Sequence, residues 1–261
     1  MSTQPDQAAR WHLLLDALAE RSALSVAEAA DLLGVSAATV RRDFGELARR
    51  QLASRTHGGI VATSVAYNLP AKYRTSTDDP RERIAIAASA RIAPGSIVAF
   101  NGGTTTTAIA RRFAARTDLA EASEFTTVVT NALNIASDLV LRPSVRTVVI
   151  GGVARPQSYE LHGPFASRVL KDLLVEDLFL GVDALGPDGA SCRHLGEAGI
   201  NSEMTEHAQR VTVVATAEKI GRVSLARICG LDRVDALITD TTAPTDLVEG
   251  LREAGVDVTT V

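Results

Sequence analysis

Residues 25–49 read SVAEAADLLGVSAATVRRDFGELAR, and this stretch decides the fold of the N-terminal part of the chain. It opens with a capping box, in which the Ser25 hydroxyl caps a free helical amide and the Glu28 carboxylate returns to the cap amide. The helix that follows ends at Gly34, because glycine best tolerates the left-handed conformation that ends helices. Ser36 then caps a second helix. Two helices therefore meet across a very short turn.

The second helix has one apolar face, formed by Val40, Phe44 and Leu47 at helical spacing. Small residues and paired arginines remain on the other face, where they can approach base edges and phosphates closely. This pattern predicts a helix-turn-helix whose DNA-contacting residues are Ser36, Ala37, Ala38, Thr39, Arg41 and Arg42. Two alternatives stay open: a solvated helical hairpin whose arginines bind nothing specific, and a hairpin that binds protein partners.

Two short β-prone pieces follow the second helix and enclose a polar, glycine-containing turn, which predicts a wing. Arg55 and His57 would contact the sugar-phosphate backbone from this wing. Between residues 41 and 57 there are five arginines and only two acidic residues, whereas the whole chain carries a formal net charge of −4. We therefore expect one local basic surface and no general basic coat.

The chain of 261 residues, 46% of them hydrophobic, has room for one large or two unequal domains. Residues 62–80 are rich in Ser, Thr and Pro and fit a connector. The predicted domains are a winged helix-turn-helix over 1–62, a linker over 63–80 and an α/β domain over 81–261. No apolar run is long enough for a membrane span, and Cys192 and Cys229 fit no disulfide framework, so we expect a cytoplasmic protein.

The C-terminal part alternates short apolar runs with helical patterns, which predicts a mainly parallel sheet covered on both faces. The expected strands are residues 96–100, 126–130, 146–150, 178–182, 211–215 and 236–239. Ligands bind at the carboxyl ends of such strands.

One loop in that position is Asn101-Gly-Gly-Thr-Thr-Thr-Thr107, which opens a helix and is suited to cradle a phosphate. A tight strand-to-helix turn capped by threonines is an equally good interpretation. The loop matches neither the Walker nor the GxGxxG pattern, so it gives no support to dinucleotide binding. Thr130-Asn131 and Gly151-Gly152 follow the next two expected strands and favour a shared pocket.

The segment LGVSAATVRRDFGELARRQLASRTHGGIV, residues 33–61, resembles the signature of DeoR-type bacterial transcription regulators. The segments FNGGTTTT, VVTNAL, VIGGVARP, LHGP, FLGVDAL, GEAGINSEM and TAEKIG resemble the sensor domain of the same family. The resemblance implies that the second helix is the recognition helix and that HGG ends the wing. It also implies a sensor domain related in fold to ribose-5-phosphate isomerase, which binds phosphorylated sugars or their catabolites.

The resemblance also implies effector-binding residues. By it, Gly103, Thr104 and Thr105 hold the phosphate, and Asn131, Gly152, Asp183, Glu197 and Lys219 lie near the sugar. Asn101 is a further candidate, although the family usually has Asp there, so a sugar-hydroxyl acceptor is lost.

Two functions are compatible with these patterns. The first is a regulator that binds double-stranded operator DNA as a homodimer or homotetramer, represses a carbohydrate catabolic operon and is released by a phosphorylated sugar. Residues 81–261 are then its effector-binding and oligomerisation domain. The alternative is a sugar-phosphate isomerase-like enzyme with a helical oligomerisation domain, using Asp183, Glu197 and Lys219 as acid and base groups. Asn101 and Thr216 oppose the enzyme, because by the resemblance an Asp is expected at each of these positions and this sequence has a neutral side chain there. For a regulator we expect no catalytic residues and no cofactor. We also expect no metal, since the histidines lack the spacing of metal ligands.

Overall fold

The computed structural model describes residues 7–21, 23–49, 53–56, 58–62, 73, 78–120 and 124–261. The chain divides into two compact units, Met1–Pro70 and Ala71–Val261, and each is considered by itself. The predicted linker over 63–80 falls mostly outside the described residues. Within those residues, no helix has both the length and the apolar character to cross a bilayer.

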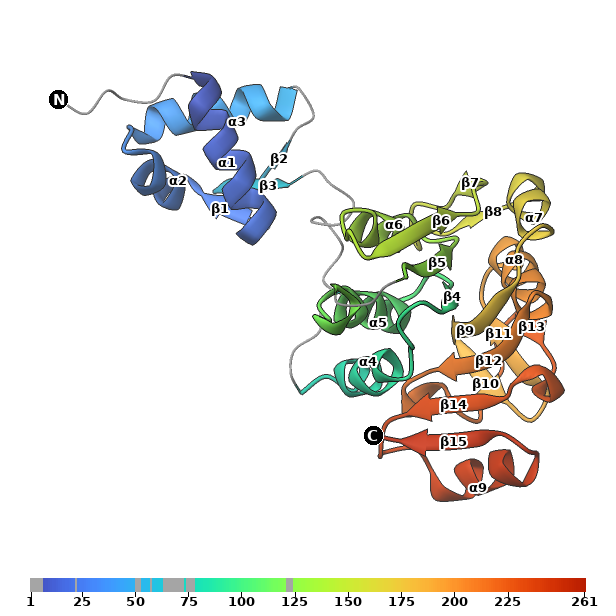
Figure 1. The fold of residues 1–261 in the computed structure, drawn as a ribbon. Helices are drawn as coiled ribbons and strands as arrows, with labels where there is room; N and C mark the ends of the chain where they lie inside the picture. Colours follow the sequence, from blue (N-terminus) through green and yellow to red (C-terminus); the bar gives the residue numbers. More distant parts are fainter. Residues whose placement is uncertain are drawn as a thin grey trace. The chain divides into compact units, whose positions relative to one another are not determined.

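The N-terminal unit is a small helical domain with a three-stranded antiparallel sheet of order β1-β3-β2. Its elements are α1 (Gln7–Arg21), β1 (Ala23–Ser25), α2 (Val26–Leu33), α3 (Ala37–Arg49), β2 (Ala53–Arg55) and β3 (Gly59–Ala62). Strands β2 and β3 form the hairpin expected for a wing (Figure 1). The fold is a winged helix-turn-helix.

The caps that the sequence predicts are present. The Glu28 amide donates to Ser25 Oγ at 3.1 Å and the Ser25 amide donates to Glu28 Oε2 at 2.8 Å, which completes the capping box. Gly34 ends α2 with φ of 64°, and the Thr39 amide donates to Ser36 Oγ at 3.2 Å at the start of α3. The turn between α2 and α3 is therefore fixed by local chemistry.

The apolar face of α3 packs into the core of the unit as predicted. Val40, Phe44 and Leu47 are buried together with Leu14 and Leu18 of α1. Because these side chains use one face of α3, the opposite face is left to solvent.

The C-terminal unit is built on a seven-stranded parallel sheet of order β15-β14-β12-β9-β4-β5-β6. Its strands are β4 (Ile97–Phe100), β5 (Thr126–Thr130), β6 (Val145–Val149), β9 (Val175–Gly181), β12 (Ala208–Val214), β14 (Ala236–Thr239) and β15 (Asp257–Thr260). The predicted mainly parallel α/β class is confirmed. Strands β5 and β14 match their predicted ranges, and the other predicted strands differ by a few residues at their ends.

Helices cover both faces of this sheet (Figure 1). One face carries α4 (Pro80–Ala90), α5 (Thr104–Ala114) and α6 (Leu133–Leu139), and the other carries α7 (Pro164–Leu170), α8 (Leu195–Glu206) and α9 (Thr245–Glu253). Alternate strand residues supply the two cores: Phe100 and Phe179 pack on the α5 side, whereas Ala99 and Leu178 pack on the α8 side. This alternation is the two-residue period of a strand.

Several elements were not expected from the sequence. They are helix α4, strand β15, a small antiparallel sheet of β10 (Ala184–Gly186), β11 (Gly189–Cys192) and β13 (Ala226–Cys229), and the pair β7 (Val153–Ala154) and β8 (Leu161–His162). All six of these strands are only two to four residues long, which is too short to show a clear pattern.

The strand order reverses between β4 and β9. From β4 the sheet grows through β5 to β6, and from β9 it grows in the other direction through β12, β14 and β15. In doubly wound sheets the crevice at the carboxyl ends of the two central strands is the usual ligand site. The topology therefore directs attention to the residues that follow Phe100 and Gly181.

Candidate functional site

The exposed face of α3 carries the predicted DNA-contacting residues. Arg41 and Arg42 are exposed, as are Ser36 and Ala38 at the start of the helix. Among the residues that the structure describes, neither arginine has a hydrogen bond or ion pair, so both guanidinium groups are available to a ligand. Ala37 and Thr39 are half-buried.

The wing adds one more exposed arginine. Arg55 ends β2 and is exposed, and within the described ranges it too has no ionic partner. His57, the other predicted wing contact, lies outside the described residues.

Asp43, which directly follows the arginine pair, faces the interior. It is 1% exposed and accepts from Arg10 Nε at 2.7 Å, from Arg10 Nη2 at 3.0 Å and from Trp11 Nε1 at 3.2 Å. This carboxylate therefore clamps α3 to α1 and does not neutralise the arginines on the surface. The exposed surface of α3 is more basic than the sequence count suggests.

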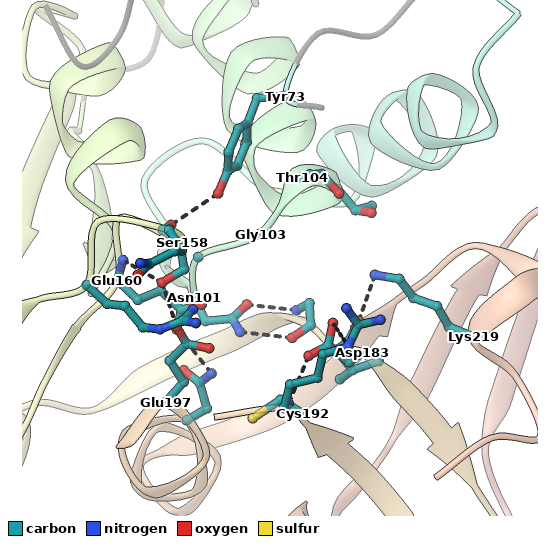
Figure 2. A pocket seen from close by; sticks show the side chains of 18 residues that line it. Tyr73, Asn101, Gly103, Thr104, Ser158, Glu160, Asp183, Cys192, Glu197 and Lys219 are labelled. Carbon is teal, nitrogen blue, oxygen red and sulfur yellow. Dashed lines mark hydrogen bonds and ion pairs between the residues drawn. The ribbon is translucent and has the colours of Figure 1, made fainter. Parts of the chain in front are cut away.

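A cavity of about 390 Å³ lies at the carboxyl ends of β4 and β9, where the strand order reverses. Its lining includes the predicted residues Asn101, Gly103, Thr104, Thr105, Asp183, Glu197 and Lys219. Residues that the sequence did not single out complete it, among them Tyr73, Arg155, Ser158, Glu160, Cys192 and Arg193. Figure 2 shows Glu160 and Glu197 on one side of the cavity and Thr104 and Lys219 on the other.

The N-terminus of α5 is the anion-suited end of this cavity. Its cap residue, Gly103, has φ of 150° and no side chain to cap the helix. The first amide with a helical acceptor is that of Thr107, at 3.1 Å from the Gly103 oxygen, so the amides before it are available at the helix end. Thr105 is buried, and its Oγ1 has no hydrogen-bond partner within the described part of the chain. Free amides, a free hydroxyl and the helix dipole together suit a phosphate.

Lys219 extends the anion-suited end. Its Nζ donates to the Val182 oxygen at 2.7 Å. Burial lowers the pKa of Lys219, and the nearby Asp183 carboxylate opposes that shift. Asp183 accepts from the Arg193 amide at 2.9 Å and lies 4.0 Å from the Arg193 guanidinium.

Asn101 joins the two central strands. Its Nδ2 donates to the Gly181 oxygen at 2.9 Å, and its Oδ1 accepts from the Gly181 amide at 2.7 Å. Both ends of the side-chain amide are thus used by backbone, and a carboxylate would satisfy only the second bond. The residue therefore positions the cavity wall through its own hydrogen bonds.

The acidic side of the cavity holds two carboxyl groups, Glu197 and Glu160, which have different partners. Glu197 is paired with Arg155 at 3.0 Å and accepts from Ser158 Oγ at 2.5 Å. Glu160 is 5% exposed, and its Oε2 accepts from the side-chain amides of Asn131 at 3.1 Å and Asn201 at 3.2 Å. Burial, and next the repulsion of Glu197, raises the pKa of Glu160 to about 8. At neutral pH this carboxyl is largely protonated.

Tyr73 and Cys192 complete the lining with neutral groups. The Tyr73 hydroxyl donates to the Ser158 oxygen at 3.2 Å, and burial raises the pKa of this phenol to about 12. Burial also raises the pKa of the Cys192 thiol, to about 11. Neither group ionises near neutral pH.

Two predicted effector residues do not line the cavity. Asn131 is fully buried beneath it, where its Oδ1 accepts from the Gly102 amide at 3.1 Å and its Nδ2 donates to Glu160. Gly152, with φ of 115°, lies where a Cβ would be 2.7 Å from the His162 oxygen, so glycine is needed to let β8 pass. The Gly151-Gly152 loop therefore supports the fold near the cavity, whereas Asn131 orients the residues that line the cavity.

The sequence singled out Asn131, but local sequence patterns could not show that Asn131 and Asn201 meet at Glu160. Asn131 and Asn201 are 29 and 41 residues away from Glu160, and only the folded sheet brings them together. Nor do the described residues contain a cluster of three or more His, Cys, Asp or Glu side chains suited to a metal.

A winged helix-turn-helix with free arginines, joined to an α/β unit with a polar cavity at its switch point, defines the class: a DNA-binding regulator with a ligand-sensing domain. Sequence models of two domains support this class. Residues 10–65 match the DeoR-like helix-turn-helix domain and residues 77–241 match the DeoR C terminal sensor domain. The chain belongs to the DeoR family of transcription regulators. The family assignment thus favours regulation over the isomerase-like alternative.

Relatives match over almost the whole chain. A protein of Escherichia coli O157:H7 named for transcriptional repression of the aga operon is 34% identical, covering 95% of this chain and 92% of the relative. The HTH-type transcriptional regulator GlpR of Haloferax volcanii is 32% identical, with 96% of each chain covered. The glycerol-3-phosphate regulon repressor of Escherichia coli K12 is 26% identical, covering 95% and 96%.

Among solved structures, ribose 5-phosphate isomerase A from Methanocaldococcus jannaschii aligns over 55% of each chain, with 15% identity and a TM-score of 0.39. The architecture given above rests on the strand order and not on this overlap.

Proposed function

We propose that the protein represses a carbohydrate catabolic operon and that a phosphorylated sugar in the cavity releases it from operator DNA. The single observation that carries this proposal is the anion-suited N-terminus of α5, which opens into the cavity of the C-terminal unit. This unit matches the sensor domain of the family. Two of the relatives above are named as repressors, one of them for the glycerol-3-phosphate regulon.

For the DNA-binding side, we propose that Ser36, Ala37, Ala38, Thr39, Arg41 and Arg42 contact the operator from α3, with Arg55 and His57 on the wing. Paired arginines can bond guanine or phosphate oxygens. One small domain buries too little DNA surface for tight specific binding, so we propose a homodimer or homotetramer that reads repeated half-sites. Operator binding would place the protein in the cytoplasm.

For the effector side, we propose that Gly103, Thr104, Thr105 and Lys219 bind the phosphate and that Asp183 and Glu197 bind sugar hydroxyls. Asn101, Asn131 and Gly152 would shape the site without contacting the sugar. An effector can release DNA only through a difference in its affinity for the DNA-bound and free states.

A thermal-shift screen against phosphorylated sugars, followed by gel shift on the promoter next to the coding sequence, tests both sides. A stabilising sugar phosphate that also weakens the gel-shift complex is the expected result. The unphosphorylated form of the same sugar is the matched control and should do neither. A screen without any stabilising phosphate would contradict the effector assignment, and a promoter that never shifts would contradict the DNA assignment.

A further inference from the structure

The carboxyl groups that line the cavity indicate which chemical group the ligand carries at the end away from its phosphate. Three carboxyl groups line the cavity in the described part of the chain, and two have a basic neighbour: Glu197 has Arg155 at 3.0 Å and Asp183 has Arg193 at 4.0 Å. Glu160 has none. Its hydrogen-bond donors are the neutral amides of Asn131 and Asn201.

Those two amides leave one oxygen of Glu160 unused. Both donate to Oε2, and Oε1 has no donor among the described residues. A carboxyl this deeply buried is stable only if it is protonated or if a cation reaches it. Without a cation the proton fills that role, and because Glu160 lines the cavity, a ligand there can bring a cation that takes the place of the proton.

We propose that the effector carries a free amine as well as its phosphate, and that Glu160 binds the ammonium group. The ligand class is therefore phosphorylated amino sugars. This inference rests on the proposed function, because a phosphate bound at Thr104 and Thr105 would leave the rest of the ligand in the cavity that Glu160 lines. Figure 2 shows Thr104 and Glu160 on opposite sides of this cavity.

Binding of the amine to Glu160 is expected to release one proton. The ammonium form of the amine pairs with the Glu160 carboxylate, and the proton that Glu160 held passes to solvent. The other groups that act on Glu160 are Glu197 on α8, Asp183 after β9 and the neutral Tyr73. Glu197 and Asp183 keep their own basic neighbours, so Glu160 is the group that changes its charge.

Isothermal titration calorimetry of the full chain tests the inference with probes that differ at one position. The probes are glucosamine 6-phosphate, glucose 6-phosphate and N-acetylglucosamine 6-phosphate, with the galacto series in parallel. We expect an amine to bind about tenfold or more tightly than its hydroxyl analogue, as a buried charge-assisted bond would allow. At pH 7, titrations in buffers of different ionisation enthalpy should show proton release with the amine and none with the hydroxyl probe.

The variant Glu160→Gln should abolish this preference while the hydroxyl probe still binds within about threefold of its wild-type affinity. Glu253→Gln, on an exposed position of α9, is the matched control and should keep the preference.

The outcomes separate the inference from the function on which it rests. Equal binding of amine and hydroxyl probes, tightest binding of an N-acetyl probe, or a preference that survives in Glu160→Gln would overturn the inference alone. Failure of every phosphorylated probe would overturn the proposed function and the inference with it. The wild-type titrations decide the matter even if the variant does not fold.

Discussion

The two functional regions of this protein are built in opposite ways. On α3, the exposed residues are neighbours in the sequence, and one helix with its caps places them. The cavity instead draws its lining from segments between Tyr73 and Lys219, and the sheet must form before any of them meet. A local site is visible in the sequence as a motif, whereas an assembled site is visible only in part, as loops that follow strands.

The largest effect is expected for Asp43→Ala, which tests whether the DNA-contacting face of α3 depends on the contact between α3 and α1. Asp43→Ala removes a buried carboxylate, 1% exposed, that pairs with Arg10 and accepts a hydrogen bond from Trp11. Breaking a buried pair in this way costs about 3–5 kcal/mol. We expect the N-terminal unit to unfold at a lower temperature and operator binding to be lost, while effector binding to the other unit is kept.

Calorimetric melting with and without effector measures this prediction. Asp31→Ala, at an exposed position on α2, is a matched control and should leave melting nearly unchanged. If the Asp43→Ala protein melts like wild type, the contact of Asp43 with α1 does not stabilise α3, and residues within α3 and its caps are enough to position the DNA-contacting face.

A smaller effect is expected where the site is local. Arg41→Ala and Arg42→Ala should each weaken operator binding by about 1–3 kcal/mol, because each removes an exposed guanidinium with no role in the core. Fluorescence anisotropy at several salt concentrations measures the loss and separates phosphate contacts, which reduce the salt slope, from base contacts. Arg168→Ala, exposed on α7, removes the same charge from the other unit and should have little effect. Unchanged affinity in both α3 variants would refute the recognition-helix assignment.

The contrast between the two regions explains which structural features could be predicted from the sequence. The caps at Ser25 and Ser36 and the αL residue Gly34 act over a few residues, so helix ends and the helix-turn-helix were predictable. The parallel sheet was predictable from alternation. The buried Asp43 was not, because its partners lie in α1, 32 and 33 residues away. Glu160 was missed for the same reason. The resemblance placed Gly152 near the sugar, and the sequence did not show that this glycine also makes room for the His162 backbone.

Asn101→Asp tests how tightly the assembled cavity is specified. An aspartate at this position keeps the acceptor for the Gly181 amide but loses the donor to the Gly181 oxygen and places a carboxylate against it. We expect a loss of about 1–2 kcal/mol in the free energy of unfolding at pH 7. The loss should shrink toward pH 5, because a protonated carboxyl regains the donor. Denaturant unfolding at both pH values measures this, and a loss that grows on acidification would contradict it.

The smallest expected effect separates a ligand contact from a fold contact within one helical turn. Thr105 Oγ1 lacks a partner in the described structure, whereas Thr107 Oγ1 donates to the Gly103 oxygen at 2.6 Å and accepts from Asn134 Nδ2 at 2.8 Å. Thr105→Val should therefore leave the stability of the empty protein unchanged or slightly higher and weaken effector binding by about 1 kcal/mol, roughly fivefold. Thr107→Val should do the reverse, lowering stability by about 1–3 kcal/mol because it leaves buried partners unsatisfied. Melting of the empty proteins and titration with the effector give the two readouts. If Thr105→Val destabilises the empty protein as much as Thr107→Val does, the loop is a structural turn, and the phosphate must bind elsewhere in the cavity.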